Sequence, residues 1–439
     1  MVEMVIDLLK KKGAEGLVYR ISNKNRSVSS TIEGPERIFE RITEGIGIVA
    51  FLDGKKAFVS VANPTEESLK EAVETAVEMA KFTEADDGNV VSDEVEFEPV
   101  EGLYDESVEE YDLAKLKEIS LGLVEKAKNY DPRIKFIRGA SATISTEEVE
   151  VATTKGVNKH EKTSMAQVFI MCSAVDEKGG SMGYKFRIAR SLKSFDPYEV
   201  AIEAAEEAVG GLRAEVERTG VYDIIFSPET IAMLFNYGMW SFSGEVVYKK
   251  SSFLKKEDIG KKLFSEKLSL VNDPRNPQFM GASAFDAEGT NTKKFYVVEN
   301  GVLKSFFHNL YSAKKLEMSP TGNASVRSFR SSPSVSPMNL RMESNSSKEE
   351  IFASVKKGIF VTHMMGVHTL DPVSGRFSVQ ISGYLVENGK KVKPIRGMAL
   401  SGKLSELLSN IELIADDYKD YGSVIGSTIL VRGMSVGGK

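Results

Sequence analysis

The chain has four histidines among its 439 residues, and two of them lie five residues apart in the segment VTHMMGVHTLD. His363 and His368 could hold one metal ion only if the chain bends between them. On an α-helix a separation of five turns the second side chain by about 140°, and on a strand an odd separation puts the two on opposite faces. Gly366 permits a bend, but no H-E-x-x-H or C-x-x-C pattern accompanies the pair. We therefore predict two histidines at a strand end or in a loop, without a metal.

The other candidates for chemistry carry weaker patterns. His160 lies in the polar stretch TKGVNKHEKTS, where we predict a solvated turn. His308 lies in SFFHNLYSAKKL at a predicted strand-to-helix junction, where it could cap a helix or line a groove. A serine hydrolase would need a strained nucleophile turn such as G-x-S-x-G, which the chain lacks. A triad of His363 with a nearby serine or Asp371 stays open as an alternative.

The composition narrows the classes of function. The formal net charge of −6 argues against a nucleic-acid partner, because phosphate binding needs an excess of Lys and Arg on some face. No apolar run approaches the roughly 18–20 residues that span a bilayer, so we expect no membrane association. Cys172 is the only cysteine, which excludes a disulfide framework and a thiolate zinc cluster within one chain. We expect a cytoplasmic protein.

These residues must be positioned by an α+β fold, which we divide into four segments. They are an N-terminal α+β domain (1–85), an acidic connecting arm (86–111), a central α+β domain (112–215) and a C-terminal β-rich domain (216–439). In the first half, Asp53-Gly54 predicts a hairpin, and Thr65 caps a helix with an apolar stripe. A second helix is predicted over 112–128, strands near 134–143, 147–153, 165–175 and 181–189, and a further helix from Pro197 to Gly210-Gly211.

The second half shows antiparallel β-hairpins. The tetrapeptide VENG occurs at 298–301 and at 386–389, each time between β-rich runs. Asn-Gly is the strongest short hairpin signal, because both residues tolerate a positive φ. The stretch 318–347 is rich in Ser and Pro and has two interpretations. It is either a flexible linker or an ordered extended segment in a cleft, as Arg327, Arg330 and Arg341 beside apolar residues suggest.

Several stretches together resemble the TldD/PmbA family, also called modulators of DNA gyrase and regarded as metallopeptidases. In the second half they include SGEVVYKKSSFL (243–254), VNDPRNP (271–277), FDAEGTNTKKFYVVENGVLKSFFHNLYSAKKL (285–316), TGNAS (321–325) and SGRFSVQISGYLVENGK (374–390). In the first half, GIGIVAFLDGKKAFVSVANP and the following alanine-rich helix are similar to the family's N-terminal domain. The resemblance covers nearly the whole chain.

The resemblance implies membership of a family that has two branches. In the TldD branch a helix carries HExxxH, whose histidines bind zinc together with a cysteine near the C-terminus, and whose glutamate is the general base. The corresponding segment here, 229–248, has no histidine, and 417–433 has no cysteine. The region of the motif holds instead Phe235, Asn236, Tyr237, Met239 and Trp240. The chain thus resembles the PmbA/TldE branch, which lacks the HExxxH motif, and we expect no metal and no cofactor in this chain.

On this basis our main hypothesis is a non-catalytic subunit of a two-component zinc peptidase that acts on unfolded or small peptides. A TldD-type partner would carry the zinc in a heterodimer. One alternative is a stand-alone regulatory or chaperone-like protein, working as a homodimer. Another is a hydrolase with an unrecognised site near His363 and His368.

A peptide-binding role is predicted for the segment around TGNAS. An extended peptide binds most simply by adding a strand to a sheet edge, and an arginine can hold a substrate carboxylate bidentately. The predicted peptide-binding residues are Thr321, Gly322, Asn323, Arg327 and His308. The competing interpretation is a turn that shapes the subunit interface. Tyr237 and Trp240 are expected to pack in the core or at an interface.

Overall fold

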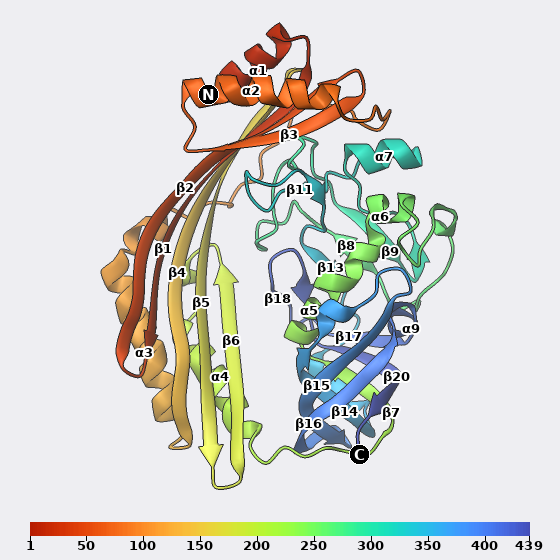
Figure 1. Cartoon of the computed structure of the whole chain (residues 1–439). Helices are drawn as coiled ribbons and strands as arrows, with labels where there is room; N and C mark the ends of the chain where they lie inside the picture. The colour runs from red at the N-terminus through yellow and green to blue at the C-terminus, as the bar shows by residue number, and fades with distance from the viewer.

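Six strands of the first half form one antiparallel sheet in the order β3-β2-β1-β4-β5-β6 (Figure 1). The computed structural model describes all residues 1–439. Four of the strands are 17 to 20 residues long, so the sheet is much longer than it is wide. The strands are β1 Glu15–Thr31, β2 Gly34–Leu52, β3 Lys55–Ala62, β4 Ile134–Thr153, β5 Asn158–Asp176 and β6 Gly179–Ala189.

Helices cover one face of this sheet. α1 Val2–Lys11 and α2 Glu66–Lys81 lie across one end, and α3 Leu113–Tyr130 and α4 Pro197–Gly210 run along the outer side (Figure 1). Thr65 caps α2 as predicted: its hydroxyl accepts the Ser68 N–H at 3.2 Å, a contact of the kind that contributes about 1 kcal/mol. Side chains at even positions of β1, such as Val18 and Val28, point into these helices. One sheet face is therefore a conventional apolar core.

The other face of the sheet turns toward the second half of the chain. Tyr19 and Ile21, at odd positions of β1, pack with Phe285 and Phe329, which come from the second half. Successive strand residues point to opposite faces, so one sequence serves both layers. Further along the same face the strands carry polar residues, including Asn23, Ser145 and Gln167.

A β-barrel forms the core of the second half. Its strand order is β16-β15-β14-β7-β20-β17, and an additional β16–β20 pairing closes the ring. β7 and β14 are parallel, and the other pairs are antiparallel. The bounds are β7 Gly220–Phe226, β14 Lys357–Met365, β15 Arg376–Glu387, β16 Lys390–Lys403, β17 Ile411–Ile414 and β20 Ile429–Gly437.

Short elements surround the barrel. The helices are α5 Pro228–Gly238, α6 Gly244–Tyr248, α7 Leu310–Leu316, α8 Lys348–Ala353 and α9 Leu404–Ser409. The strands are β8 Leu270–Asn272, β9 Phe295–Glu299, β10 Val302–Leu303, β11 Ala324–Ser325, β12 Ser334–Val335, β13 Leu340–Met342, β18 Lys419–Asp420 and β19 Ile425–Gly426. The 3₁₀ helices of the second half are η3 Met239–Phe242, η4 Lys256–Asp258 and η5 Val367–Thr369, whereas η1 Glu106–Glu110 and η2 Leu192–Ser194 belong to the first half.

The predicted α+β class and the hairpin signals are confirmed. Asp53 and Gly54 have φ of 50° and 77° between β2 and β3, and both Asn-Gly turns also have positive φ at both residues. The linker interpretation of 318–347 is wrong: this stretch forms β11, β12 and β13, and it buries Phe329 and Leu340. Cross-strand pairing and burial, which composition does not reveal, hold it in place.

Three local predictions need correction. The strands predicted at 134–143 and 147–153 are the single strand β4, because polar residues at its middle face the open side of the sheet rather than forming a turn. His160 is exposed on β5, not in a turn. The helix expected over 229–248 breaks into α5, η3 and α6. No helix combines the length and the apolar character needed to cross a membrane.

Candidate functional site

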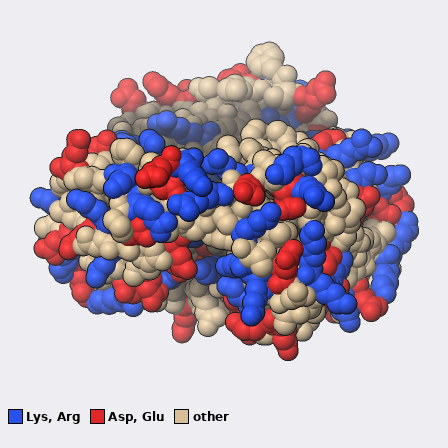
Figure 2. All heavy atoms as spheres, turned by 90° about the horizontal axis from the view of Figure 1, so that it is seen from below, with Lys and Arg blue, Asp and Glu red and all other residues tan.

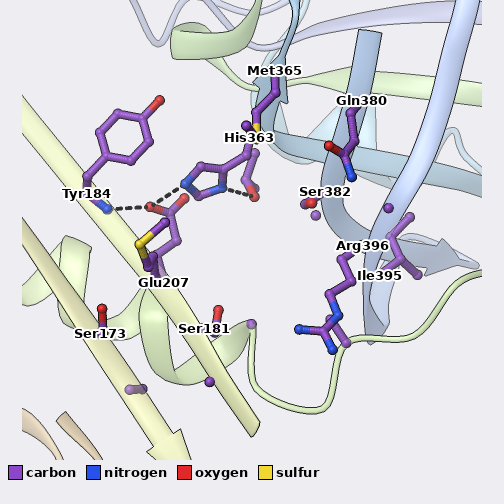
Figure 3. A pocket seen from close by; sticks show the side chains of 18 of the residues that line it. Ser173, Ser181, Tyr184, Glu207, His363, Met365, Gln380, Ser382, Ile395 and Arg396 are labelled. Atoms are coloured by element: carbon purple, nitrogen blue, oxygen red, sulfur yellow. Dashed lines mark hydrogen bonds and ion pairs between the residues drawn. The ribbon is translucent and has the colours of Figure 1, made fainter. Parts of the chain in front are cut away.

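A cavity of about 740 Å³ lies between the first sheet and the barrel (Figure 3). One wall comes from the ends of β4, β5 and β6 with the last turn of α4, and the other from β14, β15 and β16. Ligand sites in proteins have volumes of roughly 300–1,000 Å³ and occur often between domains. The position and the size of the cavity make it the leading candidate for a functional site.

A cluster of charged side chains is buried beside the cavity, at the contact between the two halves. Lys185 Nζ lies 3.0 Å from the Glu207 carboxylate and 3.1 Å from the Glu229 carboxylate. Glu207 also accepts the Tyr184 N–H at 3.4 Å. The His363 Nε2 lies 3.4 Å from Glu207 Oε2, as the dashed line in Figure 3 marks. Lys185 and Glu207 come from the first half, and Glu229 and His363 from the second.

Burial sets the charge states of this cluster. It raises the pKa of Glu207 to about 7, although Lys185 acts in the opposite direction. Burial, with the charge of Lys185, lowers the pKa of His363 to about 4. Because the imidazole is neutral at pH 7, its 3.4 Å contact with Glu207 is a polar contact and not an ion pair. His363 can therefore offer a ligand one polar atom but no charge.

His363 also approaches a hydroxyl. Thr362 Oγ1 lies 3.3 Å from His363 Nδ1, so a hydroxyl, an imidazole and a carboxylate follow one another along the cavity wall. Both distances exceed the roughly 2.6–3.2 Å of a nucleophile–base pair. The other predicted members do not join them. His368 is exposed on η5, and the Asp371 carboxylate is engaged by the Ser374 hydroxyl.

The predicted peptide-binding residues lie elsewhere, and most of them are buried. The Thr321 hydroxyl accepts the His308 N–H at 2.7 Å and donates to Asn323 Oδ1 at 2.8 Å. Asn323 Nδ2 donates to the Ser336 carbonyl at 2.8 Å. His308 is fully buried, its Nδ1 lies 3.1 Å from Ser312 Oγ, and its Nε2 has no partner.

Two members of the predicted set are placed differently. Gly322, with φ of 70°, turns the chain where an added Cβ would lie 2.5 Å from the Asn291 carbonyl oxygen. Arg327 is the exposed member. The set thus forms a hydrogen-bonded turn with one arginine at the surface.

The region that corresponds to the TldD metal site lacks the side chains that zinc prefers as ligands. α5 and the loop after β18 meet here, and Ser423 Oγ donates to Asn236 Oδ1 at 3.1 Å. Tyr237 and Trp240 are 49% and 45% exposed, so neither packs in the core. An amide, a hydroxyl and aromatic rings do not supply the imidazole and thiolate donors that zinc prefers. No group of three or more His, Cys, Asp or Glu side chains in the chain is arranged to hold a metal ion.

Sequence reasoning found His363 but missed Lys185, Glu207 and Glu229. A signal existed for Glu207. It lies between Ala204, Ala205 and Ala208, at the edge of the stripe that α4 buries. A carboxylate there must leave water or find a cation. No comparable signal marks Lys185, because only the tertiary fold brings it between two carboxylates.

Comparison with known proteins agrees with this fold. Three family models match the chain: PmbA/TldA metallopeptidase domain 1 over 20–80, the central domain over 106–212 and the C-terminal domain over 219–438. The chain is 27% identical over 444 residues to the metalloprotease PmbA homolog of Haemophilus influenzae, covering 100% of this chain and 95% of that one. It is 28% identical over 240 residues to the zinc metalloprotease TldD homolog of Saccharolobus solfataricus, covering 54% and 52% of the two chains.

A solved structure supports the same assignment of the fold. TldE from Thermococcus kodakarensis superimposes with a TM-score of 0.90 at 22% identity, over 99% of each chain. The relatives' names connect them with metalloprotease function. The chain described here belongs to the PmbA/TldD family.

Proposed function

We propose that this chain is a non-catalytic, PmbA/TldE-like subunit of a two-component zinc peptidase that acts on unfolded or small peptides in the cytoplasm. The observation that carries the proposal is the pairing of Asn236 with Ser423 where α5 meets the C-terminal loop. These side chains replace the zinc donors that the TldD branch is expected to have. The zinc, the general base and the cysteine would then come from a TldD-type partner.

In this proposal the chain contributes part of the peptide-binding surface. β6 is an edge strand, paired only with β5, and it borders the cavity between the two halves. An extended peptide can add main-chain hydrogen bonds along such an edge without demanding a particular sequence. Thr321, Asn323 and His308 would act indirectly, by holding the shape of the turn from which Arg327 projects.

The charge on the face seen from below fits a peptide better than a nucleic acid. Seen from below, acidic and basic side chains are interspersed over the visible face, and no broad basic stripe appears (Figure 2). Nucleic-acid binding needs Lys and Arg gathered on one face. A partner surface or a peptide of mixed sequence makes no such demand.

The test combines metal content with reconstitution. The chain is purified without chelators or a metal-affinity tag, and zinc is measured by elemental analysis. We expect close to none in the lone chain, and chelator-sensitive peptide hydrolysis only after a TldD-type chain is added. Zinc near one per chain, or chelator-resistant hydrolysis by the lone chain, would overturn the proposal.

Reconstitution also separates the alternatives. A stable homodimer that ignores the TldD-type chain would favour a stand-alone interaction protein. If the lone chain hydrolyses peptides, His363→Gln identifies or excludes the hydroxyl–imidazole–carboxylate arrangement in the cavity. His368→Gln is the matched control, because His368 is exposed outside this cavity.

A further inference from the structure

The charges around the cavity between the two halves are unbalanced. Arg138 and Arg396 both line it, and neither guanidinium forms an ion pair with a carboxylate. Arg138 instead lies over the Phe136 ring, 6.0 Å from its centroid. Glu207 is the only acidic residue in the lining, and it lies against the Lys185 ammonium, which it shares with Glu229. The cavity therefore offers two positive charges to an anionic ligand.

The wall also holds an unused buried polar atom. Ser173 is 6% exposed, and its hydroxyl has no hydrogen-bond partner in the protein. Phe136, Ser173 and Met182 are direct neighbours across β4, β5 and β6, so they share the sheet face that borders the cavity. A buried hydroxyl without a partner costs free energy, which a ligand atom at hydrogen-bond distance would recover.

The apolar part of the wall is adaptable. Met182, Met364 and Met365 line the cavity, and Met365 is 68% exposed. Methionine is unbranched and polarizable, and it is common on surfaces that accept varied ligands. The combination of cationic groups with adaptable apolar ones suits ligands that share an anionic group but differ in their side chains.

We propose that this cavity binds short peptides by their C-terminal carboxylate, with Arg138 and Arg396 holding the carboxylate and the methionines contacting the last side chains. The C-terminal carboxylate is the anionic group that all peptides share, whatever their side chains. The edge of β6 then lies beside the preceding residues. This inference rests on the proposed peptide-binding function, but it assigns a different site from the turn around Thr321.

The test compares two forms of one probe on the full-length chain. The probes are an Ala-Leu-Phe-Ala tetrapeptide with a free C-terminus and the same peptide with a C-terminal amide, and binding is followed by ligand-detected NMR. Charge-assisted bidentate contacts are the strong ones, so we expect the free acid to bind at least about tenfold more tightly than the amide. Equal affinities would overturn the proposal.

Substitution then locates the carboxylate. The double variant R138Q/R396Q should lose at least about tenfold in affinity for the free acid and little for the amide. Arg37→Gln is the matched control, because Arg37 is also exposed on the first sheet and lies over a phenylalanine, 5.0 Å from the Phe39 centroid, outside the cavity. If R327Q weakens the free acid and the double variant does not, the carboxylate lies at the turn and the proposal fails.

Two further outcomes are decisive. If N-acetyl-leucine, a small carboxylic acid, binds as tightly as the tetrapeptide, the cavity recognises a metabolite-sized acid and the peptide assignment is wrong. Binding to the lone chain is measured without zinc or a partner. A failure of carboxylate binding therefore leaves the subunit proposal standing. Zinc in the lone chain would overturn the subunit proposal, and the peptide-binding measurements alone would then decide on the carboxylate site.

Discussion

Glu207 and His363 lie against each other across the two halves, and burial shifts their pKa values in opposite directions. The folded protein binds the Glu207 proton more tightly than the unfolded chain does, so this contribution to stability falls as the pH rises from about 4.5 to about 7. The folded protein disfavours the His363 proton, so that contribution rises from about pH 4 to about 6.5. The two effects oppose each other over almost the same range.

Replacing either residue should therefore reveal the pH dependence of stability that the other residue contributes. Relative to the parent, E207Q should gain free energy of unfolding as the pH rises from 4.5 to 7, by at most about 1.4 kcal/mol per pH unit. Relative to the parent, H363Q should lose free energy of unfolding over a similar pH range, because it lacks the His363 contribution that rises with pH. Urea titrations between pH 4 and 7 measure both slopes. E206Q, at the exposed neighbouring position on α4, is the control. Parallel curves for all variants would show that neither group titrates as its burial implies.

At the scale of elements, the two Asn-Gly hairpins share a backbone conformation but differ in their surroundings. Gly301 has φ of 80°, and an added Cβ would lie 2.5 Å from the Phe264 carbonyl oxygen. At Gly389, with φ of 78°, the nearest atom would be the Phe352 carbonyl oxygen at 3.1 Å. The hairpin between β9 and β10 is thus packed against the chain around Phe264 more tightly than its sequence shows.

The close packing at Gly301 predicts that alanine costs more stability there than at a glycine of similar φ in open space. Gly260→Ala is the matched control, because Gly260 has φ of 85° and open space around it, so it should cost only the left-handed strain, about 1 kcal/mol. Gly301→Ala adds a backbone clash and should cost about 3 kcal/mol or more. Urea denaturation of the two variants gives the comparison. Equal losses would mean that the hairpin shifts away from Phe264 without cost.

How far sequence predicts these elements depends on whether the deciding signal is local. The cap at Thr65 and the Asn-Gly turns are local, and they were predicted correctly. The continuity of β4 was not, because polar Ser145 and Thr146 interrupt the apolar pattern at 144–146, whereas pairing with β1 and β5 continues through these residues. The cavity combines residues from β4 to β16, far apart in sequence. His363 was recognisable by its type, whereas Arg138 and Arg396 look like ordinary surface arginines.

At the scale of the whole molecule, buried polar contacts join the far end of the sheet to the second half. Lys159 on β5 is 1% exposed, and its ammonium donates to the Gly289 carbonyl at 2.8 Å and to Asn291 Oδ1 at 2.6 Å. Glu94, from the acidic arm, accepts the Asn291 N–H at 2.7 Å. One continuous sheet contains strands from both predicted α+β segments, 1–85 and 112–215. The division of the chain into four segments stays a prediction.

Lys159 should therefore control how firmly the loop 286–292 is held on the sheet. Lys159→Met keeps the apolar stem but leaves the buried Gly289 carbonyl and the partly buried Asn291 Oδ1 without this donor, which should cost about 1–3 kcal/mol and speed hydrogen exchange in this loop. Lys155→Ala is the control. Lys155 is partly exposed and lies 3.6 Å from Glu15, and a surface ion pair of this kind contributes less than about 1 kcal/mol. If Lys159→Met lowers stability while exchange in the loop is unchanged, Lys159 acts within the first sheet alone. Faster exchange in the loop and the adjoining arm would show that this single buried ammonium holds them against the first sheet.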